Sequence, residues 1–559
     1  MIQETLGHLL PELELDPHTV SALLCASAAA VAALNWMQRR RIQKKMEEAR
    51  RMRDLGLQCM EKAVQRFKQQ NPGADPSRIL SLPLVELAEK LKEGSLSAES
   101  VLYTYVDKAL AVTRELNCLR HVIPECEGQL RDLQGQKEKG LLHGVPVSIK
   151  DHIGYKGHLS TCGFAPFLGP PEQENSVLVQ VLKHQGAIPF AITNVPQSLF
   201  NYDCSNAIFG QTLNPWDHRK SPGGSSGGEG ALIAAGGSIL GFGSDLGGSI
   251  RLPSSFCGLC GLKPTVTGAI GPMAQDVGGL ALCMRALLGD ALFQLDPTVP
   301  PIPFNEKLFC ASTPLRIGYY ETDGYFLLPP CMRRAVRETG ELLQEAGHTV
   351  SPAVPTSCSE AASLLSPAAA ALQGCIVFMV AQDLVDPGLK PQVNCYRIPV
   401  LVKKILALLV RPLVSPSSGQ LQVFYGSLPT LSPQAYRTEF IAKWKKLQLD
   451  VVLCPVLGPA FTLGYPGKLL AAVSSTMLYN VLDFPAGVVP VTTVTEADEE
   501  ELLHYRGHYD DAWDRRLRKV RAVGLPVAVQ CVALPWQEEL CLRFMKEVET
   551  LACERKKCT

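Results

Sequence analysis

The chain has 559 residues, which is longer than one average domain but suits one large enzyme domain with accessory segments. Its 54 basic and 54 acidic side chains balance, and hydrophobic residues make up 46% of the chain. This balance argues against a nucleic-acid-binding protein, because such a protein carries a basic excess. The hydrophobic content favours a globular protein with a large core.

The 19 cysteines are an odd number without a regular framework, which indicates reduced thiols in a cytosolic environment rather than secreted disulfides. Cys257 and Cys260 form a single C-x-x-C motif. A structural zinc site needs a second pair of ligands at a suitable spacing, and the sequence has none after this motif. We therefore predict a packing role for both thiols, and neither a metal site nor a cofactor.

An uncharged apolar stretch near the N-terminus runs from Val20 to Leu34 and continues to Met37. It approaches the length of a membrane-spanning helix, about 17–20 residues. Acidic residues precede the stretch and the basic run 39–41 follows it, whereas a cleaved signal peptide begins with a basic region. The positive-inside rule then predicts a lumenal tail at 1–19, a signal anchor at 20–37 and a cytosolic remainder in the endoplasmic reticulum or Golgi. The alternative is an alanine-rich core helix.

Residues 38–78 are predicted to form a basic helical linker after the anchor. A second apolar segment, 398–414, is interrupted by Lys403, Lys404 and Arg411, so it is too short and too charged to span a membrane. It is either a cap that lies in the membrane interface or a core helix whose lysines extend to solvent. The separate anchor favours membrane contact.

The segments that follow the linker alternate between helix and strand. Apolar spacing predicts a helix over 84–91 that ends at Gly94, and a strand over 145–150 that carries Lys150 near its end. A helix over 176–185 then precedes an apolar strand over 188–193. This alternation predicts an α/β layer structure.

Glycine and serine dominate residues 221–255, but two apolar pieces within this stretch show that it folds. We predict a loop at 223–228, a short helix through Ala235, a strand, and a second turn at 247–249. Glycine lets backbone amides approach a ligand closely, and successive amides at such turns bind anions. In an acyl-transfer enzyme these amides would form an oxyanion hole beside a serine.

Other interpretations of this stretch are open. A phosphate-binding loop would need a lysine that the stretch lacks, and a purely structural turn is disfavoured by two serine-bearing turns. The main rival is a nucleophile elbow, because 223–227 satisfies G-x-S-x-G. Ser225 would then be the nucleophile, with His504 or His508 as its base. However, the elbow should follow a strand, and 211–222 reads as a loop.

The Lys150–Asp151 pair, the GGSSGG loop and the downstream GGSIR resemble the amidase signature family. Four longer segments resemble the membrane-bound fatty acid amide hydrolases of that family, at 194–216, 254–265, 482–495 and 524–549. The resemblance implies a central mixed, twisted β-sheet covered by α-helices, with an N-terminal transmembrane helix. It also implies an amidase domain over 79–551, a C-terminal tail over 552–559 and a homodimer.

The resemblance also implies a Ser-Ser-Lys triad. Ser249 would attack the amide carbonyl, Ser225 would bridge, and Lys150 would be the base. A lysine is a base only when neutral, so its pKa must fall from about 10.4 by roughly three units, which burial can produce. The implied oxyanion donors are the backbone amides of Leu246, Gly247, Gly248 and Ser249. Asp245 and Arg251 would form a supporting ion pair.

The substrate implied is a long-chain fatty acyl amide, either an N-acylethanolamine such as anandamide or a primary amide such as oleamide, taken from membrane lipid. Leu199 matches a substrate-contacting position of the family. Phe200, Tyr202 and Trp513 are placed for an apolar acyl channel, although core packing explains each of them equally well.

The sequence departs from the family pattern after Thr265. Only Val266–Ile270 lies before Gly271, where the relatives have a longer segment, and 355–430 also diverges. The missing segment could contain a core strand or part of the substrate wall. Two hypotheses therefore stand: an active hydrolase, or an inactive paralogue that binds lipid amides without turnover.

Overall fold

The computed structural model describes residues 17–73, 75–136, 138–324, 327–353, 383–399, 402, 405, 432–466, 473–507 and 514–558. Trp513, His508 and most of the segment 398–414 lie outside the described residues. The predictions for these residues therefore stay predictions.

The fold is organised by one mixed sheet of 11 strands, in the order β1-β3-β2-β6-β8-β7-β12-β13-β11-β9-β10. The strands of this sheet are β1 (Leu119–Val122), β2 (Pro146–Lys150), β3 (Ile188–Thr193), β6 (Leu240–Asp245), β7 (Cys260–Lys263), β8 (Ala269–Ala274), β9 (Arg316–Tyr319), β10 (Thr349–Pro352), β11 (Val451–Pro455), β12 (Ala486–Thr493) and β13 (Pro526–Val532). β4 (Ser205–Asn206) and β5 (Gly210–Gln211) form a separate ribbon. The predicted mixed α/β sheet is confirmed.

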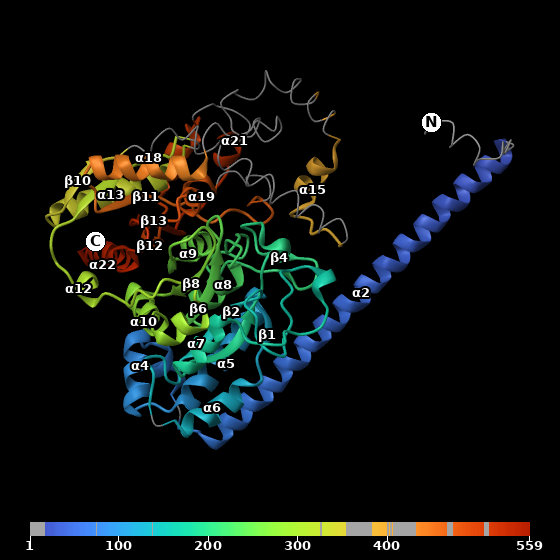
Figure 1. The fold of residues 1–559 in the computed structure, drawn as a ribbon, viewed down its shortest axis with the longest axis horizontal. Helices are drawn as coiled ribbons and strands as arrows, with labels where there is room; N and C mark the ends of the chain where they lie inside the picture. The colour runs from blue at the N-terminus through green and yellow to red at the C-terminus, as the bar shows by residue number, and fades with distance from the viewer. Residues whose placement is uncertain are drawn as a thin grey trace, which may run out of the picture.

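Helices cover the sheet (Figure 1). They are α2 (Pro17–Gln70), α3 (Pro76–Leu80), α4 (Leu84–Glu93), α5 (Ala98–Leu116), α6 (Cys126–Gln134), α7 (Val177–His184), α8 (Gly227–Ala234), α9 (Arg251–Cys257), α10 (Val277–Leu287), α11 (Asp290–Leu295), α12 (Glu306–Phe309), α13 (Pro330–Glu345), α15 (Lys390–Arg397), α18 (Pro433–Lys446), α19 (Ser474–Val481), α20 (Glu496–Leu503), α21 (Asp514–Leu517) and α22 (Glu538–Cys558). Two short 3₁₀ turns are η1 (Ala165–Phe167) and η2 (Gln197–Leu199).

The local elements predicted around Lys150 are confirmed. α4 ends at Gly94, whose φ of 81° is the left-handed conformation that glycine adopts without strain. β2 lies between β3 and β6 and is parallel to both, and every residue of β2 and β3 is buried. Central parallel strands are covered on both faces, which explains their nearly continuous apolar sequences. Lys150 is therefore the last residue of a central strand.

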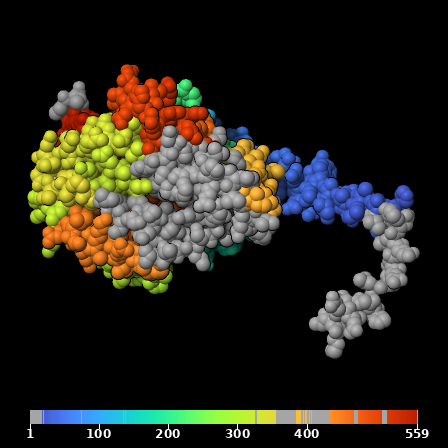
Figure 2. Space-filling view, turned by 90° about the horizontal axis from the view of Figure 1, so that it is seen from above, coloured from blue at the N-terminus to red at the C-terminus, as the bar shows by residue number. Residues whose placement is uncertain are grey.

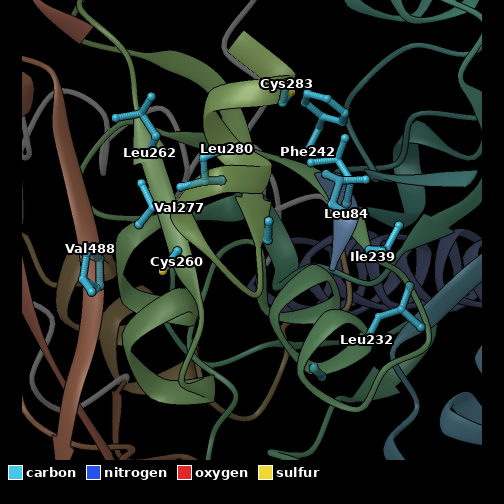
Figure 3. Close-up of a cluster of buried hydrophobic side chains, with 14 of the residues drawn as sticks. Leu84, Leu232, Ile239, Phe242, Cys260, Leu262, Val277, Leu280, Cys283 and Val488 are labelled. Atoms are coloured by element: carbon cyan, nitrogen blue, oxygen red, sulfur yellow. The ribbon is translucent and has the colours of Figure 1, made fainter. Parts of the chain in front are cut away.

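The core lies between this sheet and the helices packed on it. Figure 3 shows Leu232 of α8, Phe242 of β6, Leu262 of β7, and Val277 and Leu280 of α10, all buried in one cluster. Fully burying a side chain of this size contributes about 1.5–3 kcal/mol. The strands that carry the glycine-rich turns are therefore held by a continuous apolar core.

The short link after Thr265 connects β7 to β8, which pair antiparallel through Cys260–Ala274 and Gly261–Met273. β8 pairs with β6 along its whole length and with β7 at its end, so the sheet continues through this region. The Lys263 amine, which is buried, donates to the carbonyls of Pro264 (2.6 Å) and Val266 (2.9 Å) at the tip of the hairpin. The sheet therefore continues from β6 through β8 to β7 across the short link; that the longer segment of the relatives adds a strand or part of the substrate wall stays a prediction.

α2 is a single helix of 54 residues whose first half projects from the body (Figures 1 and 2). The stretch Ser21–Gln70 contains a window apolar enough to cross a membrane, and none of that window is buried. The second half packs on the body through Met60, Val64 and Phe67, which are buried. The predicted anchor and linker are thus parts of one continuous helix that ends at Gln70; the domain boundaries themselves stay predictions.

Polar contacts fix the middle of α2 to the body. The Arg50 guanidinium donates to the carbonyl of Ile208 (2.6 Å), and Arg53 donates to Asn117 Oδ1 (2.7 Å). At a rise of about 1.5 Å per residue, the distance along the helix from Met37 to the first buried side chain, Met46, is only about 14 Å. The apolar window is therefore joined to the body by a short, regular helical segment.

Candidate active site

The Lys150 side chain is fully buried at the end of β2. Its amine lies 2.7 Å from Ser225 Oγ, 3.0 Å from Ser244 Oγ and 3.3 Å from the Ser244 carbonyl oxygen. Ser225 is 75 residues further along the chain, in the loop that precedes α8. The fold thus brings together the lysine and the first serine that the sequence predicted as a pair.

The surroundings of Lys150 favour the neutral amine. Burial lowers its pKa to about 7, although the negative charge of Asp245 opposes this shift. Burial disfavours a charged group because the protein interior solvates it less well than water does. With a pKa of about 7, roughly half of the amine is neutral at pH 7 and can accept a proton, whereas an ordinary surface lysine is almost fully protonated at this pH.

Ser249 lies in the turn between β6 and α9, and its side chain is half-buried. The carbonyl of Ser249 accepts a hydrogen bond from the amide of Ser226, the neighbour of Ser225, at 3.1 Å. The two serine-bearing loops that the sequence predicted are therefore in direct contact. Lys150, Ser225 and Ser249 belong to three adjoining segments of one site.

Asp245 shapes the turn that carries Ser249. Its Oδ1 accepts from the amide of Gly248 (2.7 Å), and its Oδ2 accepts from the amide of Ile250 (3.1 Å). Gly248 has a φ of 123°, and a Cβ there would overlap Thr476 Oγ1, so only glycine fits. The Gly248 N–H already donates to Asp245, so it is occupied and is not offered to an oxyanion in this structure.

The predicted ion pair between Asp245 and Arg251 is present and fully buried, at 2.8 Å. Arg251 also donates to the carbonyl of Thr476 (2.7 Å), to Gln530 Oε1 (2.7 Å) and to Asn480 Oδ1 (2.6 Å). Burial alone would raise the pKa of Asp245, but Arg251 holds it well below its usual value. Removing one partner of such a pair typically costs about 3–5 kcal/mol, so this network fixes the turn against α19 and β13.

Ser244 was missed by the sequence analysis. It lies on β6, five residues before Ser249, and its hydroxyl is within 3.0 Å of the Lys150 amine. The sequence signal that could have identified Ser244 is its position in the serine- and glycine-rich stretch. However, its contact with Lys150 depends on the pairing of β6 with β2, which the sequence alone does not reveal. Ser244 gives the amine a second hydroxyl partner besides Ser225.

The predicted acyl-channel residues have different environments. Leu199 and Phe200 are half-buried, and Phe200 packs with Phe164 and Leu389 in a small apolar cluster. Tyr202 is 3% exposed and packs against Phe461, with ring centroids 5.8 Å apart. This packing does not support a place for Tyr202 on a channel wall; its large aromatic ring instead fills the core.

The geometry does not support the nucleophile elbow. Between Gln211 and α8 the chain contains no strand, only an isolated bridge at Lys220, so Ser225 lacks the strand that an elbow requires. His504, at the end of α20, is exposed. The partner that the fold places against Ser225 is Lys150.

Comparisons with known proteins agree with this architecture. The family model described as Amidase matches residues 100–542. Fatty-acid amide hydrolase 1 of Sus scrofa is 51% identical over 558 residues, which cover 95% of this chain and 96% of that protein. The vitamin D3 hydroxylase-associated protein of Gallus gallus is 57% identical over 446 residues, which cover 76% of this chain and 96% of that protein.

A solved structure of a fatty acid amide hydrolase superposes with a TM-score of 0.72 at 23% identity, covering 91% of this chain and 95% of that chain. At this identity the likeness is one of fold. The fold and the site together define a hydrolase of the amidase signature type. The chain belongs to the amidase family, and its relatives support amide hydrolysis as its class of reaction.

Proposed function

We propose that this protein hydrolyses long-chain fatty acyl amides through an acyl-enzyme on Ser249. The observation that carries the proposal is the buried Lys150 amine, which lies 2.7 Å from Ser225 Oγ in a loop bonded to the Ser249 turn. The acyl specificity rests on the named relatives, one of which is a fatty-acid amide hydrolase at 51% identity.

In the proposed reaction, Ser249 Oγ attacks the carbonyl carbon, and its proton passes through the Ser225 hydroxyl to the neutral Lys150 amine. A hydroxyl both donates and accepts, so Ser225 suits this relay. The amides of Leu246, Gly247 and Ser249 are the proposed donors to the tetrahedral oxyanion. When the C–N bond breaks, the proton returns through Ser225 to the leaving nitrogen. Water then attacks the ester carbonyl and passes its proton through Ser225 to Lys150. The C–O bond to Ser249 Oγ breaks, the proton returns to Ser249, and the fatty acid leaves.

Turnover of a long-chain amide tests this proposal. The purified full chain in detergent is expected to release oleic acid and ammonia from oleamide, and arachidonic acid and ethanolamine from anandamide. Acetamide should react far more slowly, because remote apolar contacts contribute binding energy to the reacting complex. Fatty acid is measured by mass spectrometry, with the Ser249→Ala variant as control.

Two results would contradict the proposal in different ways. Protein that labels with a fluorophosphonate at Ser249 but releases no fatty acid would favour the inactive paralogue, which was motivated by the short link 266–270. Equal rates on acetamide and oleamide would leave the amidase chemistry intact and overturn the long-chain specificity.

We also propose that the apolar part of α2 anchors the protein in an endomembrane, with the body in the cytosol. The fully exposed apolar window and the basic run 39–41 after it support this orientation. The full chain is expected to resist extraction by alkaline carbonate, whereas a variant lacking residues 1–38 should be extracted. In intact microsomes, protease added outside should digest the body; a protected body would reverse the orientation. A homodimer stays an expectation from the family resemblance.

A further inference from the structure

A second buried ionisable group, Glu229, lies beneath the catalytic lysine and has no part in the reaction described above. Glu229 is on α8, four residues after Ser225, and is fully buried. Its Oε2 is 2.5 Å from Ser148 Oγ, and its Oε1 accepts from Thr193 Oγ1 at 3.0 Å. One carboxyl group therefore joins α8 to two strands of the sheet.

These contacts surround Lys150. Ser148 precedes Lys150 by two residues on β2, so the two side chains lie on the same face of the strand. Thr193 on β3 is the register partner of Lys150. Gly241 on β6 is the register partner of Ser148, and a Cβ at this glycine would overlap Glu229 Oε2. The carboxyl group thus fills a space shared by β2, β3 and β6, next to the strand end that holds the amine.

We propose that Glu229 is a positioning residue that, in its protonated form, holds the Lys150 strand against the Ser225 loop and keeps Lys150 neutral. This role rests on the proposed function of Lys150 as the base. The neutral acid donates from Oε2 to Ser148 Oγ, which donates to Ser238 Oγ (3.0 Å), which in turn donates to the Leu240 carbonyl (2.9 Å). Every hydroxyl in this chain has both a donor and an acceptor, so no charge is needed to satisfy it.

Electrostatics agree with the protonated form. Burial raises the pKa of Glu229 to about 8, although the hydrogen bond from Thr193 and the positive charge of Lys150 oppose this shift. Among the described residues, Lys150 on β2 is the charged group that acts on Glu229; the Cys118 thiol before β1 also faces it, and its pKa is raised mainly by burial. The negative charge of Asp245 on β6 also acts on Lys150 and raises its pKa. An ionised Glu229 would add a second negative charge near Lys150 and favour the ammonium, which cannot act as a base.

Two substitutions of Glu229 separate its possible roles. In Glu229→Gln, Nε2 donates to Ser148 and Oε1 accepts from Thr193, so the amide copies the neutral acid. The rate of fluorophosphonate labelling of Ser249 in the full-length enzyme is expected to stay near the wild-type rate. The acid midpoint, which is the pH at which this rate falls to half as the pH is lowered, should also stay near pH 7. Glu229→Ala removes every contact, and displacement of Lys150 is expected to slow labelling by roughly 10- to 100-fold.

Several outcomes overturn the proposal. An acid midpoint that falls by about one unit or more in Glu229→Gln would mean that Glu229 is ionised in the working enzyme. Equal losses in both variants would show that the neutral hydrogen-bonded form is not what matters. Wild-type labelling per folded molecule in Glu229→Ala, with a lower melting temperature, would reduce Glu229 to a packing role.

Glu539→Gln and Glu539→Ala are matched controls. Glu539 is also a buried carboxyl whose pKa is raised by burial, but it lies on α22 and accepts from the amide of Asn305. These controls are expected to keep the acid midpoint of labelling. Labelling of Ser249 does not require turnover. A wild-type enzyme that labels but releases no fatty acid would therefore overturn the proposed function, while the labelling rates of the Glu229 variants would still test the role of Glu229.

Discussion

Replacing Ser249 with alanine is expected to reduce amide hydrolysis by roughly 10⁴-fold or more and to abolish labelling by a fluorophosphonate. The loss is large because no acyl-enzyme can form without the nucleophile. The backbone of the turn should stay intact, since Asp245 holds it through the amides of Gly248 and Ile250 rather than through the Ser249 side chain. Intact-protein mass spectrometry after labelling gives the result.

The Ser225→Ala variant decides between the two possible nucleophiles. If Ser225 only relays the proton, labelling of Ser225→Ala slows but still occurs on Ser249. Labelling that survives Ser249→Ala and vanishes in Ser225→Ala would instead establish Ser225 as the nucleophile. Ser255→Ala is a matched control, because Ser255 is a buried serine on α9 whose hydroxyl has no hydrogen-bond partner in the described part of the chain.

Replacing Lys150 with methionine is expected to lower kcat by roughly 10²- to 10⁴-fold, the usual contribution of a general base. Methionine fills a similar volume but has no lone pair that accepts the serine proton. In the proposed mechanism the neutral amine is the active form, and burial lowers the pKa of Lys150 to about 7. Activity should therefore fall as the pH drops through about 7 and the amine becomes protonated. The profile of kcat/KM against pH measures both effects.

Lys263→Met supplies the control for this pH dependence. Lys263 is also buried, and burial lowers its pKa to about 7, but its amine donates to carbonyls at the β7–β8 hairpin. Its replacement is expected to lower stability and to leave the acid limb of the profile unchanged. An acid limb that persists in Lys150→Met, or disappears in Lys263→Met, would assign the titration to a group other than Lys150.

Local sequence patterns predicted the elements around the site well. The helix ending at Gly94, the strand ending at Lys150 and the two serine-bearing turns depend on residues close together in the chain, and each is present. The ion pair of Asp245 and Arg251 was also predictable, because the two residues are six positions apart and flank one turn. Such features are decided by backbone geometry and short-range contacts, which a single sequence displays directly.

Features that depend on sheet order were not predictable in this way. Ser244 approaches Lys150 because β6 lies beside β2, although these strands are far apart in the sequence. Glu229 comes from α8 and is bonded to Ser148 on β2 and Thr193 on β3. Tyr202 could belong to a channel or to the core, and only its packing against Phe461 distinguishes the two. The effect of the short link after Thr265 on the sheet could likewise not be predicted, because it depends on the pairing of β8 with both β6 and β7.

The sequence by itself displayed the two serine-bearing glycine turns, the strand ending at Lys150 and the apolar N-terminal segment, because each is a pattern within a short stretch of chain; the Ser-Ser-Lys triad came from the family resemblance and stays a proposal. Only the tertiary structure decided that Lys150 meets Ser225 across 75 residues, that burial lowers the pKa of this lysine to about 7, and that α2 continues from the apolar window into the body. A side chain's pKa depends on which groups surround it and on how much water reaches it. Those surroundings exist only once distant strands have paired and the core has closed around them.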